Sequence, residues 1–239
     1  MNLRLAAVLL LAAAAPARAD ETPDPPLVDA VKAGDLATIK ARLAGGADLA
    51  AKDKYGWTAT MWAAGHADAT VLKALLDAGG AAAPAAGFDA IVEAAKNGKA
   101  ANVSLLAAKG LDCSAKDAGG VPALAYAASV SAPAVAALLA CKAKVNARDG
   151  DGRTALIRAA QLGRADAIKL LAAAGAKVDL KDKLGYTALM WAAHEGQVAS
   201  VKALRAARAD PSLRAADGLT AAAMADARGH ADAAAALSP

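Results

Sequence analysis

The segment GRTALIRAAQLGRADAIKLLAAAGAKVDLKD, residues 152–182, decides the fold of this 239-residue chain. It contains two short apolar runs separated by a glycine turn, and a second glycine follows the second run. Thr154 precedes the first run at a position suited to a helix cap, and Leu170-Leu171 gives the second run a buried stripe. The segment therefore predicts two short helices joined by a tight turn and followed by a polar loop.

The same pattern recurs along most of the chain. The glycines that open successive copies are 31, 33, 32, 33 and 33 residues apart, and they are Gly56, Gly87, Gly120, Gly152, Gly185 and Gly218. A fixed period of this length indicates an array of similar units, each of which buries its apolar face only against its neighbours. Residues 25–239 hold about seven such units, with atypical units at both ends.

Several positions agree from copy to copy: an Asp-x-x-Gly-x-Thr corner, paired alanines, Leu-Leu, and Gly-Ala-x-Val-Asp/Asn. Together they resemble the ankyrin repeat, which has a period of about 33 residues. The resemblance implies an all-α solenoid, in which helix-turn-helix units are joined by hairpins, over residues 25–239. Tetratricopeptide repeats have a similar period but lack the Asp-x-x-Gly-x-Thr corner, so we place them second.

The third and fourth units depart most from the pattern. Asp89-Ala90 replaces the usual Thr-Pro pair of the third unit, and Val121-Pro122 stands at the corner of the fourth. Lys142 occupies the place where a glycine usually ends the second helix. We therefore expect residues 86–149 to be the least stable internal part of the array.

The first nineteen residues, MNLRLAAVLLLAAAAPARA, have the pattern of a secretory signal peptide. One early cation precedes an apolar stretch of 11 residues, which is shorter than a membrane span, and Ala17-Arg18-Ala19 forms a small-residue cleavage site. We expect cleavage between Ala19 and Asp20 and a short N-terminal segment over residues 20–24. The alanine-rich composition is typical of a bacterial gene of high GC content, so we expect an exported bacterial protein of the periplasm.

Composition excludes several classes of function. Without Arg4 and Arg18 the net charge falls from +4 to about +2, which is too even to favour nucleic acid or a membrane surface as the partner. The three histidines lie apart, and the chain contains no Cys-x-x-Cys, His-x-x-x-His or phosphate-binding glycine motif. We therefore expect a monomer without catalytic residues, cofactor or metal.

The seven aromatic residues predict a partner-binding surface. The resemblance implies that residues beside the corner glycine, or just before the paired alanines, face a concave groove, and every aromatic residue falls at one of these positions. Aromatic and arginine side chains dominate the energetics of protein interfaces. The predicted partner-binding residues are Tyr55, Trp57, Trp62, Phe88, Glu93, Tyr126, Arg158, Tyr186 and Trp191. A second interpretation is that these rings only pack against one another between units.

Three further hypotheses stay open at this stage. The protein could be an immunity-like inhibitor of an exported toxin or hydrolase, or an accessory factor for a periplasmic stress enzyme. Cys113 and Cys141 lie in adjacent units and could form a disulfide in an oxidising compartment, or both could be small buried residues.

Overall fold

The computed structural model describes residues 24–80 and 89–238, which contain fourteen helices. The predicted signal peptide and Phe88 lie outside these ranges. Within them, β pairing is limited to two isolated bridges, Lys116 with Pro122 and Arg148 with Thr154. The helices are α1 (Pro26–Ala33), α2 (Leu36–Ala44), α3 (Ala59–His66), α4 (Ala69–Asp77), α5 (Ala90–Lys96), α6 (Ala100–Ala108), α7 (Ala123–Val130), α8 (Ala132–Ala140), α9 (Ala155–Gln161), α10 (Ala165–Ala173), α11 (Ala188–His194), α12 (Val198–Ala206), α13 (Ala221–Ala227) and α14 (Ala231–Ala235).

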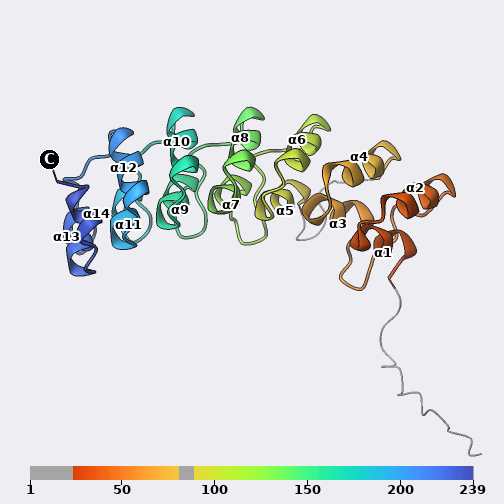
Figure 1. Ribbon diagram of the computed structural model, residues 1–239, viewed down its shortest axis with the longest axis horizontal. Helices are drawn as coiled ribbons and strands as arrows, with labels where there is room; N and C mark the ends of the chain where they lie inside the picture. Colours follow the sequence, from red (N-terminus) through yellow and green to blue (C-terminus); the bar gives the residue numbers. More distant parts are fainter. Residues whose placement is uncertain (1–23, 81–88, 239) are drawn as a thin grey trace, which may run out of the picture.

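The helices stack as seven pairs in chain order, which we call units 1 to 7 (Figure 1). The odd-numbered helices form one row and the even-numbered helices a second row, and each helix packs against its counterpart in the next unit. We call the segment that leads into an odd-numbered helix its hairpin, and the odd-numbered row with its hairpins the hairpin side. The prediction of an all-α solenoid of repeated units is confirmed.

Threonine caps the odd-numbered helices where the repeat pattern is regular. The side chains of Thr58, Thr154, Thr187 and Thr220 each accept a hydrogen bond from the backbone N–H three residues ahead. In unit 3 Asp89 performs this role for α5, whereas Pro122 opens α7 without a side-chain cap. Because of its unusual corner, unit 4 therefore lacks one capping interaction. Such a cap typically stabilises a helix by about 1 kcal/mol.

Left-handed residues follow the even-numbered helices α2 to α12, as the glycine pattern predicts. Gly79, Gly110 and Gly175 have φ values of 90°, 86° and 84°. Lys142 and Arg208 occupy the same position with φ values of 64° and 63°, a conformation that is strained for residues with a Cβ atom.

Small residues form the contacts between units. The paired alanines, such as Ala159 and Ala160, are fully buried and let neighbouring helices approach closely, while leucines of the even-numbered helices fill the space between the rows. The buried Asn102 of α6 reaches back to unit 2, where its Nδ2 lies 3.0 to 3.1 Å from the carbonyl oxygens of Ala63, Ala64 and Ala67. The core is therefore a continuous layer along the array.

Candidate functional site

An aspartate fixes the turn of each regular hairpin. Asp149 shows the geometry: its Oδ1 accepts hydrogen bonds from the backbone N–H groups of Asp151 and Arg153, both at 2.9 Å. The same oxygen of the equivalent aspartates accepts backbone N–H groups of their own hairpins. We call these residues the corner aspartates; they are Asp53, Asp117, Asp149 and Asp182.

The second oxygen of each corner aspartate binds the side chain nine residues later, on the odd-numbered helix that follows. These side chains are four of the predicted partner-binding residues, so their polar atoms are paired within the protein. The bonds are Trp62 Nε1 to Asp53 at 2.7 Å, Tyr126 Oη to Asp117 at 2.6 Å, Arg158 Nε and a terminal nitrogen to Asp149 at 3.0 and 2.6 Å, and Trp191 Nε1 to Asp182 at 2.8 Å.

Units 3 and 7 differ at this position. In unit 3 Glu93 pairs instead with Lys96 of the same helix, at 2.8 Å. In unit 7 Ala215 replaces the corner aspartate and Met224 replaces its partner. Donor and acceptor are therefore both absent from unit 7, which leaves no unpaired carboxylate at that position.

A cation from the preceding unit completes three of these arrangements. Lys32 Nζ lies 4.5 Å from the centre of the Trp62 ring and 3.0 Å from the Asp53 carboxylate. The other two are Lys96 with Tyr126 and Asp117, at 5.0 and 4.0 Å, and Arg153 with Trp191 and Asp182, at 4.7 and 3.6 Å. We call these sets the cation–ring–carboxylate triads. They join units 1 and 2, 3 and 4, and 5 and 6.

The carboxylate contacts change the acidity of the groups involved. Burial alone raises the pKa of Asp53, but hydrogen bonds from the Trp57 backbone, Trp62 and Lys32 outweigh it and lower the pKa to about 2. In the same way the pKa values of Asp117 and Asp149 are lowered, since donors on Tyr126 and Arg158 outweigh burial. The pKa of Tyr126 rises to about 12, because burial and Asp117 both oppose its ionisation. The carboxylates of Asp53, Asp117 and Asp149 are therefore held in the charged form.

Burial divides the aromatic residues between the groove and the packing that the second interpretation describes. Trp191 is 7% exposed and belongs to the core. Trp57, Trp62, Tyr126 and Tyr186 are partly buried against it. The polar side-chain atoms of the last three reach carboxylates. Of the aromatic residues that the structure describes, only Tyr55 is largely exposed, at 67%.

Two ring clusters lie at matching places in units 2 and 6. In unit 2 the Trp62 ring lies 5.0 Å from both Trp57 and His66, measured between ring centres. In unit 6 the Trp191 ring lies 5.3 Å from Tyr186 and 5.7 Å from His194. A cavity of about 330 Å³ opens beside Trp62 and is lined in part by Lys32 and His66. His66 and His194 therefore take part in ring packing.

Five large apolar side chains are exposed in the described ranges, and all lie on the hairpin side. Three occupy hairpins and two lie where α7 and α9 end; they are Tyr55, Leu184, Leu219, Val130 and Leu162. Sequence reasoning identified only Tyr55. The repeat register could have identified Val130 and Leu162. The equivalent positions of the other internal units hold polar residues, which are His66, Asn97 and Glu195.

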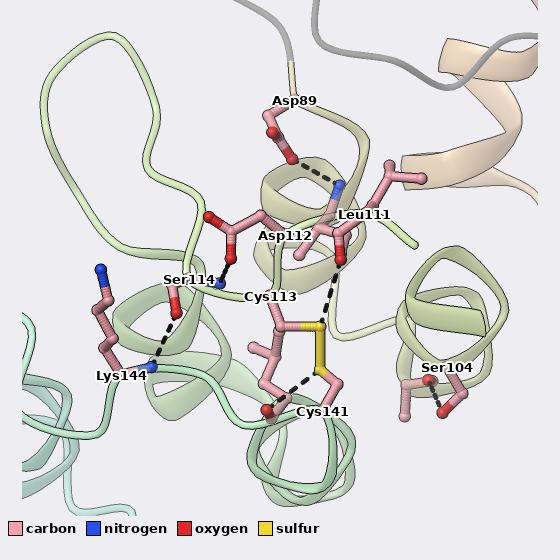
Figure 2. Close-up of a disulfide and its surroundings, with 11 residues drawn as sticks. Asp89, Ser104, Leu111, Asp112, Cys113, Ser114, Cys141 and Lys144 are labelled. Carbon is pink, nitrogen blue, oxygen red and sulfur yellow. Dashed lines mark hydrogen bonds between the residues drawn. A yellow bond between two sulfur atoms is a disulfide. The ribbon is translucent and has the colours of Figure 1, made fainter. Parts of the chain in front are cut away.

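The two cysteines are joined. The structure contains a disulfide between Cys113, in the loop after α6, and Cys141, at the end of α8, with Cα atoms 6.1 Å apart (Figure 2). It therefore links units 3 and 4 covalently, in addition to the triad that joins the same two units.

Residues 24–80 and 89–238 contain no group of three or more His, Cys, Asp or Glu residues that could hold a metal ion. No helix in the same part of the chain has both the length and the apolar character needed to cross a membrane.

Comparison with known families points to one repeat. The model for ankyrin repeats (3 copies) matches residues 27–117 and 124–215. A search of curated proteins found no match.

Proposed function

The chain belongs to the ankyrin-repeat family, and we propose that it is a non-catalytic scaffold that binds a protein or peptide partner in the groove on its hairpin side. The family is generally a non-catalytic interaction module, which supports this class of function. Binding would then depend on the shape and chemistry of an exposed surface, since a solenoid has no deep central cleft.

One observation carries the choice of surface. The large apolar side chains that the described residues expose lie on hairpins or at the ends of odd-numbered helices, whereas the even-numbered helices expose none. Exposed apolar groups next to charged ones are typical of protein interfaces. Tyr55 lies beside Lys54, and Leu184 beside Lys183, so the hairpins present apolar and positively charged groups together.

The corner aspartates and their partners support this surface from below. Trp62, Tyr126, Arg158 and Trp191 hold each hairpin against its helix, so the hairpins are presented in a fixed position. A rigid surface loses less conformational entropy when it binds. Trp57, Glu93 and Tyr186 are partly exposed, and they stay predicted contacts of the partner.

The periplasm is part of this proposal. The signal-like pattern of residues 1–19 and the disulfide both favour an oxidising compartment outside the cytoplasm. N-terminal sequencing of the chain recovered from the periplasm of a bacterial host is expected to begin at Asp20. Recovery of the intact chain in the cytoplasm would contradict the proposed periplasmic location.

Site-specific photo-crosslinking tests the binding surface. A photoreactive residue at Tyr55 or Leu184 is expected to form an adduct with one and the same partner in cells of the native host. Lys169 on α10 and Lys202 on α12 are exposed control positions on the even-numbered row, where no such adduct is expected. Adducts from the control positions, with none from the hairpins, would place the interface on the opposite side.

The crosslinked partner also separates the remaining hypotheses. An immunity-like inhibitor abolishes the activity of its toxin or hydrolase at a one-to-one ratio. An accessory factor instead maintains the activity of a stress enzyme during an oxidative challenge. Several unrelated partners captured at the same positions would instead support a general scaffold.

A further inference from the structure

Contacts between neighbouring units determine how many units of this array fold and unfold together. The close helix contacts join helices of the same unit or of adjacent units. In such a one-dimensional array, stability is the sum of unit and interface contributions, so a weak interface divides the chain into parts that can open separately.

Unit 4 departs from the repeat pattern at three places. Its first helix begins at Pro122 without a side-chain cap, and Ser131 alone separates α7 from α8, whereas three residues separate α9 from α10. Lys142 then ends the unit with a strained left-handed backbone. These departures accumulate in the segment between the two cysteines and just beyond it.

The disulfide spans this segment. Cys113 and Cys141 are 28 residues apart, and the enclosed chain contains the unit 4 hairpin, α7 and α8 (Figure 2). Two hydrogen bonds accompany the disulfide. The backbone N–H of Lys144 donates to Ser114 Oγ at 3.0 Å, and Lys116 Nζ donates to the carbonyl of Arg148 at 2.9 Å. A crosslink that closes such a loop lowers the entropy that the chain gains when the segment opens.

The next two interfaces, between units 4 and 5 and between units 5 and 6, show which residues occupy the cysteine positions where there is no disulfide. Val145 and Val178 occupy the position of Cys113 in units 4 and 5, and Ala174 and Ala207 occupy that of Cys141 at the helix ends of units 5 and 6. Valine and alanine thus fill the same places by packing alone. The disulfide is an addition at the one interface that joins the least regular units.

We propose that the Cys113–Cys141 disulfide is a redox-sensitive clamp that makes the array open as one cooperative unit. When the clamp is reduced, units 3 and 4 separate and unit 4 opens. Units 1 to 3 and units 5 to 7 stay folded, because three consecutive units bury enough apolar surface.

A dithiol is the reductant that this step requires. Its thiolate attacks the sulfur of Cys141, which is more exposed than the 4% exposed Cys113, and the S–S bond breaks to release the Cys113 thiolate. The second thiol of the reductant then displaces Cys141 from the mixed disulfide. Each cysteine takes up one proton, and the dithiol ends as an intramolecular disulfide, so two electrons and two protons pass to the protein.

The surroundings of Cys113 make this reduction slow in the closed array. Its leaving thiolate forms at a buried residue, next in sequence to Asp112. The region already disfavours negative charge, since burial raises the pKa of Asp89 and the charge of Asp112 raises it further. The clamp therefore resists brief exposure to thiols and responds to sustained reducing conditions.

Hydrogen exchange of the full chain tests the proposal. Exchange is compared between the oxidised protein and the protein reduced with dithiothreitol, with intact mass used to verify complete reduction. Amides in residues 117–141 are expected to exchange at least about tenfold faster after reduction, while those in residues 155–238 change by less than about twofold. Unchanged exchange in residues 117–141, or equal acceleration along the whole chain, would overturn the proposal.

A matched variant controls for direct effects of the reductant. The double substitution Cys113→Val and Cys141→Ala installs the residues that the array itself uses at these positions. Its exchange is expected to be independent of dithiothreitol. A response of this variant equal to that of the natural chain would show that the reductant acts elsewhere and would also overturn the proposal.

Discussion

A corner aspartate performs two tasks with its two carboxylate oxygens. One oxygen holds the turn of the hairpin, and the other binds a side chain on the following helix. Because a charged hydrogen-bonding group is costly to leave unpaired in a buried place, both partners are fixed by the same residue. The aromatic position before the paired alanines is therefore mainly structural, although its ring edge reaches the surface in units 2 and 4.

Trp191 provides a test of this pairing. The substitution Trp191→Phe keeps an aromatic side chain but removes the indole donor to the buried Asp182, so we expect the free energy of unfolding to fall by about 1 to 3 kcal/mol. Trp62→Phe is the control: the cation that stays with Asp53, Lys32 at 3.0 Å, is closer than Arg153 is to Asp182, at 3.6 Å, so this variant should lose less. Urea denaturation measures both changes. Equal stability of Trp191→Phe and the natural chain would show that the bond contributes little.

The backbone at Arg208 predicts a stabilising substitution. Arg208 has a φ of 63°, so Arg208→Gly should relieve strain and raise the free energy of unfolding by about 1 kcal/mol. The reverse change, Gly175→Ala, should lower it by a similar amount, since a Cβ atom there meets no neighbour and only the backbone is affected. Thermal denaturation checks the pair, and two changes of the same sign would refute the argument.

At the scale of the elements, the hairpin of unit 2 predicts loss of stability in acid. The pKa of Asp53 lies near 2 in the folded protein, below its ordinary value of 3.8, so its carboxylate stabilises the fold above pH 3.8. This contribution, about 2 kcal/mol, is lost as the pH falls through 2.

Urea denaturation between pH 5 and 2 measures the effect. Asp53→Asn should flatten the pH dependence, whereas Asp166→Asn, a change at a largely exposed carboxylate of α10, should leave it intact. A parallel pH dependence in Asp53→Asn and the natural chain would contradict the assignment.

The elements themselves could be predicted from the sequence, while their side-chain pairing could not. Periodicity and glycine positions predict the helix pairs and the left-handed ends at Gly79 and Gly175, because these depend on local backbone chemistry. The bond between Asp149 and Arg158 depends on how a hairpin folds over its helix, which periodicity does not specify. The cysteines could be placed in adjacent units, but their distance required the packing of those units.

Exposure was the hardest property of the site to predict. An aromatic residue at a groove position can point outward, as Tyr55 does, or pack between units, as Trp191 does. The deciding factor is a carboxylate nine residues earlier, which draws the indole or phenol donor inward. With that spacing known, Trp62, Tyr126 and Trp191 could be assigned to the framework from sequence.

At the scale of the whole molecule, the C-terminal end should be the least protected part of the described array. Unit 7 lacks the corner aspartate, α14 has five residues, and no further unit packs against them in the described chain. We expect amides in residues 221–238 to exchange faster than those of α11 and α12. Equal protection of α14 and α12 would show that the last unit is as stable as an internal one.

The triads join the units two by two, which has a consequence for shortening the protein. Excising units 3 and 4 together leaves Lys32 beside Trp62 and Arg153 beside Trp191, so both remaining triads survive. Excising unit 3 alone would place Tyr126 next to unit 2, where Gly65 stands in the register of Lys96. Engineered miniatures should therefore tolerate the loss of units 3 and 4 together better than the loss of unit 3 alone, and their melting temperatures would reveal the difference.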